Sequence, residues 1–157
     1  MKNKMTLAVL GISLLSFGTD VHAVCSNAIV VGGWGFTGTG VIILPTGPVP
    51  VAAVGTAQFD PEGNISGSQD RSLGGDSQHE TFSGTYSITR SCALTITTNV
   101  YDDAGNLQRT TTLRGVVVRN GRQTRMIYQS ITLPSGAPLP SVLTLEADRI
   151  AVEHSRN

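Results

Sequence analysis

The chain has 157 residues, of which 11 are basic and 11 acidic, so its formal net charge at pH 7 is zero. This length suits a single domain. A chain without a strongly basic balance lacks the positive face that nucleic-acid phosphates select, so the composition argues against nucleic acid as a partner.

The first 23 residues are typical of a secretory signal peptide. Lys2 and Lys4 precede an apolar-to-small run, Met5–Phe17, and Val21 and Ala23 supply the small side chains that signal peptidase needs. The run is shorter than the roughly 20 apolar residues that cross a bilayer. We expect cleavage after residue 23 and export of the product to the periplasm or out of the cell.

The mature chain, residues 24–157, is expected to form one domain without a transmembrane segment. Its nine arginines face ten acidic residues, a net charge of −1. Cys25 and Cys92 are expected to form a disulfide in an oxidising compartment, which would remove about 4 kcal/mol of unfolded-state entropy. Two alternatives are free thiols and a lipid-anchored Cys25, although Val24 is not the small residue that lipoprotein processing prefers.

Thr, Val, Ile and Gly dominate the mature chain, no window keeps a helical apolar period, and turn signals recur at short intervals. We expect strands at Val30–Gly40, Val51–Phe59, Asn64–Leu73, Thr81–Thr89, Ala93–Tyr101, Leu107–Arg119, Gln123–Leu133 and Ser141–Ile150. About eight strands joined by short turns predict an all-β fold, a single antiparallel up-and-down β-barrel, because closure removes exposed edges. A β-sandwich is the alternative.

Several turns have specific chemistry. Asn120-Gly121 predicts a type I′ hairpin, since both central residues need positive φ. Phe59–Ile65 and Tyr101–Leu107 share the pattern aromatic-Asp-x-x-Gly-Asn-aliphatic and predict two similar hairpins. Calcium binding is the alternative for these two loops, but neither has the length or carboxylate density of a calcium motif.

Three segments are expected to be loops. Pro45–Pro50 and Pro134–Pro140 are rich in proline, which cannot donate to a ladder, and Gly74–Glu80 is polar. If these segments lie at one end of a barrel, they frame its mouth.

The patterns Cys25-Ser26-Asn27-Ala28, Gly33-Trp34-Gly35-Phe36 and Gly84-Thr85-Tyr86 before Cys92 resemble a group of small secreted bacterial proteins without assigned activity. Gly32-Gly33-Trp34 also resembles the first strand of lipocalins and other calycin barrels. In those proteins a late arginine packs over the tryptophan ring, and this resemblance implies Arg149 as the counterpart. Trp34 itself is interpreted as a plug of the core at the closed end of a barrel.

Residues for catalysis are few. Of the histidines outside the signal, His79 and His154, the first lies beside Glu80, but neighbours on a strand point to opposite faces, and a solvated loop pair is expected. No paired spacing supports a metal site, and no cofactor is expected. An enzyme of the cyclase or isomerase kind stays an alternative, in which an arginine or one of these residues would face a cavity: Tyr86, Tyr101, Tyr128, Glu146.

The leading hypothesis is an exported, non-enzymatic barrel that binds a small apolar or amphipathic ligand, or a partner protein, through its open end. The candidate ligand-binding residues are Trp34, Tyr128, Arg114 and Arg125. The two arginines belong to a group around the Asn120-Gly121 hairpin that predicts anion binding if its members share a face, or else a charged, soluble hairpin. A third hypothesis is a structural envelope protein, or one that associates with itself, without a pocket.

Overall fold

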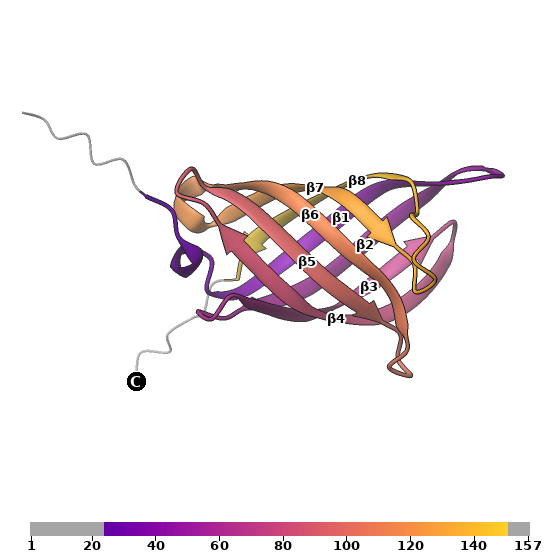
Figure 1. Cartoon of the computed structure of the whole chain (residues 1–157), viewed down its shortest axis with the longest axis horizontal. Helices are drawn as coiled ribbons and strands as arrows, with labels where there is room; N and C mark the ends of the chain where they lie inside the picture. Colours follow the sequence, from indigo (N-terminus) through magenta and orange to yellow (C-terminus); the bar gives the residue numbers. More distant parts are fainter. Residues whose placement is uncertain (1–23, 151–157) are drawn as a thin grey trace, which may run out of the picture.

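Residues 24–150 are described by a computed structural model, which shows eight antiparallel strands closed into a barrel (Figure 1). Each strand pairs with the next, and the last pairs with the first. The up-and-down barrel is therefore confirmed over the sandwich. The proposed signal peptide and His154 lie outside the described residues. The strands are β1 (Gly32–Leu44), β2 (Gly47–Phe59), β3 (Asn64–Leu73), β4 (Asp76–Ile88), β5 (Ala93–Tyr101), β6 (Leu107–Val118), β7 (Gln123–Thr132) and β8 (Ser141–Arg149).

Alternation of side chains places the core inside the barrel. On β5, the side chains of Leu94, Ile96, Thr98 and Val100 are buried, whereas those between them are more exposed. Each apolar side chain that such a strand fully buries contributes about 1.5–3 kcal/mol. Gly67, which faces inward, leaves room for an aromatic ring, because a Cβ at this position would lie 2.5 Å from the Phe82 ring.

The proline-rich segment after β1 is not the loop that its composition predicts. Pro48 and Pro50 lie within β2 and pair in register with Ile43 and Val41. Pairing of β2 with β3 begins only at Val51, so β2 is an edge strand over these prolines, and an edge is where a strand tolerates proline.

The prediction of a loop over Gly74–Glu80 is also wrong. Only Gly74 and Gly75 form the turn, with φ values of 60° and 103°, and β4 begins at Asp76. Two successive glycines allow the tight hairpin that brings β4 back along β3. As a result, Glu80 belongs to a strand and points inward, and it is fully buried.

The two similar turns are confirmed. The Asp60 carboxylate accepts the Asn64 backbone N–H at 2.7 Å, and Asp102 accepts the Asn106 N–H at 2.8 Å. Their oxygens also accept the asparagine side-chain amides. These contacts lower the pKa of both carboxyls, with the asparagine side chains as the main cause.

The Asn120-Gly121 turn differs from the expected two-residue type I′ hairpin. Both residues have the positive φ that the sequence predicts, 55° and 79°, but Arg119 has φ 50° as well. Since Val118 pairs with Gln123, the connection contains four residues.

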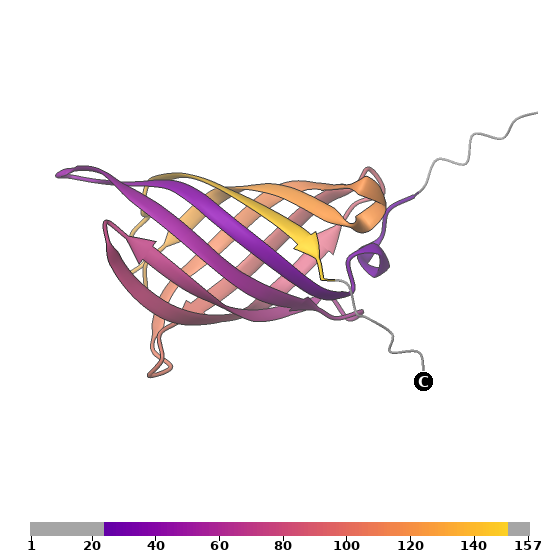
Figure 2. The same cartoon turned by 180° about the vertical axis from the view of Figure 1, so that it is seen from behind.

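The connections β1–β2, β3–β4, β5–β6 and β7–β8 lie at one end of the barrel, and the chain enters and leaves at the other (Figures 1 and 2). The three segments predicted to frame the mouth therefore lie at the same end. No helix among residues 24–150 has the length and apolarity to cross a membrane.

Disulfide and packing at the closed end

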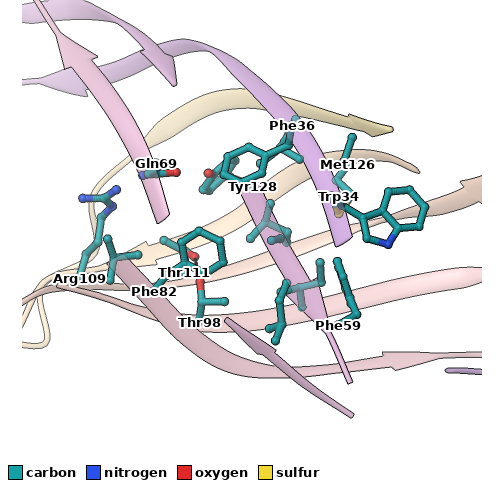
Figure 3. A pocket seen from close by; sticks show the side chains of 17 residues that line it. Trp34, Phe36, Phe59, Gln69, Phe82, Thr98, Arg109, Thr111, Met126 and Tyr128 are labelled. Carbon is teal, nitrogen blue, oxygen red and sulfur yellow. Dashed lines mark hydrogen bonds between the residues drawn. The ribbon is translucent and has the colours of Figure 1, made fainter. Parts of the chain in front are cut away.

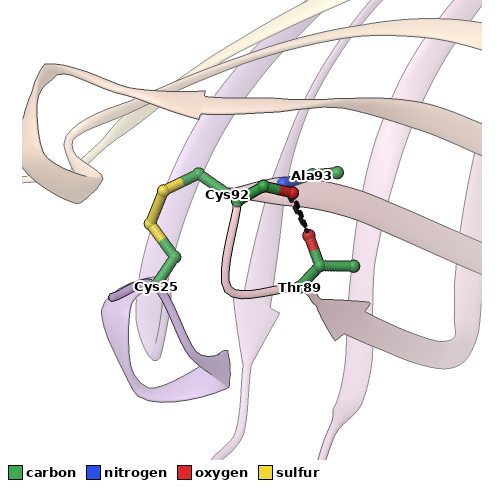
Figure 4. The surroundings of a disulfide bond; sticks show 5 residues. Cys25, Thr89, Cys92 and Ala93 are labelled. Atoms are coloured by element: carbon green, nitrogen blue, oxygen red, sulfur yellow. Dashed lines mark hydrogen bonds between the residues drawn. A yellow bond between two sulfur atoms is a disulfide. The ribbon is translucent and has the colours of Figure 1, made fainter. Parts of the chain in front are cut away.

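The N-terminal segment is fixed to the closed end by the predicted disulfide between Cys25 and Cys92, whose Cα atoms are 5.1 Å apart (Figure 4). The bond leaves neither cysteine as a free thiol, so the alternative of two free thiols is wrong. The short 3₁₀ helix Asn27–Ile29 follows, and the Asn27 side chain accepts the Ile88 backbone N–H at 2.9 Å.

Trp34 closes the barrel interior at this end. Its side chain has no exposed surface, and its indole N–H donates to the Val30 carbonyl at 2.7 Å. The Arg149 guanidinium lies 5.3 Å from the centre of the ring and donates to the carbonyls of Ile29 and Val31. The predicted contact between Arg149 and Trp34 is thus confirmed, whereas the resemblance to lipocalins stays a prediction.

Candidate functional site

The barrel interior contains a small apolar chamber of about 50 Å³ next to Trp34 (Figure 3). Its walls are mainly aromatic and aliphatic, including Phe36, Phe82 and Met126. Phe36 and Phe82 meet edge to face, with their ring centres 5.9 Å apart. This volume holds only about three to five water-sized groups, so the closed half of the barrel is nearly filled.

A larger cavity of about 180 Å³ lies towards the mouth, and we call it the vestibule. Its apolar walls come from five strands and from the β7–β8 loop, which contributes Leu133 and Leu139. Gln69, Arg109 and Tyr128 line both cavities and therefore separate the vestibule from the apolar chamber. The apolar residues of the vestibule wall are Ile42, Val51, Ala53, Leu73, Ile131, Leu133, Leu139 and Leu143.

A buried ionic cluster forms the floor of the vestibule. The Glu80 carboxylate accepts two hydrogen bonds from Arg109, at 2.7 and 2.6 Å, and one from Arg71 Nε at 2.9 Å. Gln69 donates a fourth at 2.7 Å. The side chains of Arg71 and Arg109 are each 13 % exposed, whereas Glu80 is 1 % exposed.

These contacts determine the ionisation of Glu80. Burial alone would raise its pKa, but the hydrogen bonds and positive charge of Arg109, with the hydrogen bonds of Gln69 and Arg71, outweigh that effect and lower the pKa to about 2. Glu80 is therefore a carboxylate at neutral pH. Two guanidinium groups and one carboxylate leave the cluster with one excess positive charge.

Tyr128 brings a phenol to the same place, between the two cavities. Burial raises the pKa of Tyr128, so it stays protonated at neutral pH and can donate a hydrogen bond. Below it, the hydroxyls of Thr98 and Thr111 bond to each other at 2.9 Å. The polar groups that line the apolar chamber thus include two neutral hydroxyls that share one hydrogen bond.

The structure brings together two of the four predicted ligand-binding residues. Trp34 and Tyr128 both line the interior. Arg114 and Arg125 are exposed on the outer face, where they flank a shallow groove, and Arg125 lies 3.9 Å from Glu146. Because these two positions point away from the core, they do not belong to the interior site, and anion binding by them stays a prediction.

The residues considered for an enzyme are scattered. The Tyr86 hydroxyl donates to the Asp60 carbonyl at 2.5 Å, far from the vestibule, and Glu146 is exposed. His79 is on the outer face of β4, where it contacts Asp70 at 2.9 Å, and the hydrogen bond to Asp70 raises its pKa. Of that group, Tyr128 is the one that lines the two interior cavities described above.

The ionic cluster is not among the sites predicted from the sequence. Gln69, Arg71 and Arg109 are not among the predicted ligand-binding residues, and Glu80 is predicted to lie in a solvated loop. The sequence does indicate the burial of Glu80. Glu80 lies two and six positions before Phe82 and Tyr86, which point inward on β4, so alternation places Glu80 on the same face.

No protein-family model matches this chain, and no curated protein matches it. Among residues 24–150, no group of three or more His, Cys, Asp or Glu side chains is placed to hold a metal ion. Function is therefore inferred from the geometry and chemistry of the barrel interior.

Proposed function

We propose that the protein is an exported binding protein that takes up a small amphipathic molecule through the open end of its barrel. The observation that carries this proposal is the vestibule, in which an aliphatic wall surrounds a floor of buried polar groups. An amphipathic molecule satisfies both surfaces at once, because its apolar part covers the wall and its polar end reaches the floor.

The size of the vestibule supports a ligand of modest length. About 180 Å³ corresponds to roughly a dozen water-sized groups. The apolar chamber beyond the floor is too small for a second molecule of this size, so one ligand per barrel is expected.

The ionisation of the interior groups favours binding over acid–base catalysis. A general acid or base works best with a pKa near the operating pH. Glu80 has a pKa of about 2 and Tyr128 has a raised pKa, so neither exchanges protons readily at neutral pH. The ionisation of these two groups supports the non-enzymatic hypothesis over the cyclase or isomerase alternative.

Export to the periplasm or out of the cell is part of the proposal. It is supported by the signal-like first 23 residues and by the disulfide, a bond that persists in oxidising compartments.

The test uses two neighbouring alanines of β2. Ala53 lines the vestibule, and Ala52 is exposed on the outer face. Calorimetric titration of the wild-type protein with 1-octanol and with octanoate should give saturable binding of at least one of them, with one site per chain. Ala53→Phe should weaken that binding at least tenfold by filling the vestibule, and Ala52→Phe should leave it unchanged.

Two results would overturn the proposal. One is the absence of binding for both compounds. The other is binding that Ala53→Phe and Ala52→Phe affect equally, since such binding occurs outside the barrel.

A further inference from the structure

The charge of the vestibule floor is unbalanced. Glu80 is one carboxylate, and Arg71 and Arg109 are two guanidinium groups within hydrogen-bond distance of it. All three side chains are at least 87 % buried, so water screens the excess charge only partly. A buried excess of positive charge is costly, and a bound anion lowers that cost.

The floor also has more hydrogen-bond donors than acceptors. The carboxylate of Glu80 has about four acceptor sites and accepts four hydrogen bonds, so it is saturated. Arg71 donates to Glu80 and to Gln78, and Arg109 donates twice to Glu80. Since a guanidinium has five N–H donors, most donors of both arginines remain for another acceptor.

These donors lie where a ligand would meet them. Arg71 and Arg109 both line the vestibule, and so does Tyr128. Glu80 itself lines neither cavity, because the arginines and Gln69 cover it. The side of the cluster that faces the vestibule therefore presents donors with net positive charge, beneath an aliphatic wall.

We propose that the vestibule selects amphiphiles whose polar end is a single carboxylate, held by Arg71 and Arg109 with the hydrocarbon against the aliphatic wall. This inference rests on the proposed function and specifies the ligand class of the same site. One negative charge neutralises the excess of the floor. A planar carboxylate also matches the forked donors of a guanidinium. An alcohol leaves the excess charge unpaired, and an alkylammonium adds to it.

The first experiment compares three ligands with the same eight-carbon chain by calorimetric titration at pH 7.5. Octanoate should bind at least tenfold more tightly than 1-octanol, because hydrogen bonds to a charged group are stronger than neutral ones. Octylammonium should bind more weakly than either. Equal affinities for octanoate and 1-octanol, or tighter binding of octylammonium, would overturn the inference and leave the proposed function intact. Binding of neither octanoate nor 1-octanol would overturn the proposed function.

The second experiment uses two variants that remove the same charge at different places. Arg71→Gln leaves the pair of Arg109 and Glu80 neutral, and should reduce the preference for octanoate over 1-octanol to less than threefold. Arg90→Gln removes an exposed arginine from the connection between β4 and β5 and should keep the wild-type preference. Arg71→Lys keeps the charge and should keep the preference for the anion.

If Arg71 only stabilised the fold, Arg71→Gln would weaken the binding of both ligands by the same factor. The readout is therefore the ratio of the two affinities. A wild-type ratio in Arg71→Gln would overturn the assignment of this residue, and so would a ratio lost in Arg90→Gln. If Arg71→Gln does not fold, the ratio in wild-type protein and in Arg71→Lys still decides the inference.

Discussion

The ionic cluster should make the free energy of unfolding fall as the pH is lowered. Glu80→Gln should remove the part of this pH dependence that comes from Glu80. Glu80 has a pKa of about 2 in the folded protein against an ordinary value of 4.5. A lowered pKa in the folded state means stability that is present above pH 4.5 and is lost as the pH falls towards 2. The shift corresponds to about 3 kcal/mol.

The measurement is urea unfolding of wild type and Glu80→Gln between pH 7 and pH 2, followed by the fluorescence of Trp34, the single tryptophan. At pH 7 the variant should be less stable by roughly 3–5 kcal/mol, because two buried guanidinium groups lose their carboxylate. Towards pH 2 the difference should shrink by about 3 kcal/mol. Asp60 and Asp102 also have lowered pKa values, but both proteins retain them, so the comparison isolates Glu80. A stability difference that is the same at every pH would refute this account of the cluster.

Three further predictions concern the scaffold. Replacing Cys25 and Cys92 together by serine should lower the free energy of unfolding by about 4 kcal/mol, measured with urea, and an unchanged midpoint would contradict this. Gly84→Ala should destabilise the barrel strongly, because a Cβ there would lie 1.9 Å from a backbone oxygen. Gly35→Ala should be mild, since its nearest neighbour is 3.9 Å away, and equal melting temperatures of the two variants would contradict the packing. Trp34→Phe should cost about 1–3 kcal/mol by leaving a buried carbonyl without its donor, and a variant as stable as wild type in thermal unfolding would contradict that role.

Much of the fold could be predicted because its signals are local. The bounds expected for Asn64–Leu73 and Ala93–Tyr101 are those of β3 and β5. Turn chemistry at Asp60 and Asp102 predicts two hairpins that the hydrogen bonds confirm. These features depend on residues within one turn of each other, and local propensity is sufficient to specify them.

The errors arose where the environment overrides composition. Pro48 and Pro50 are compatible with a strand because β2 has only one neighbour there, which composition does not reveal. The polar composition of Gly74–Glu80 predicts a solvated loop, but Glu80 is buried by partners from β3 and β6, up to 29 residues away. Alternation along β4 predicts that Glu80 points inward. The contact with Arg109 also depends on the register between strands, which one sequence does not provide.

The candidate site was only half predictable for the same reason. Trp34 alternates with Phe36 between glycines, which predicts that its side chain points inward, whereas the consecutive apolar residues Met126–Tyr128 do not indicate the direction of Tyr128. Closeness in sequence to one hairpin predicts a shared site for Arg114 and Arg125, whereas the arginines of the vestibule lie 38 positions apart, on β3 and β6.

A crystal structure of the protein with octanoate tests the central claim most directly. We expect one octanoate inside the barrel, with its carboxylate oxygens within hydrogen-bond distance of Arg71 and Arg109 and its alkyl chain along the aliphatic wall beside Leu139. Octanoate bound on the outer face, or bound inside with its carboxylate turned away from both arginines, would contradict the account.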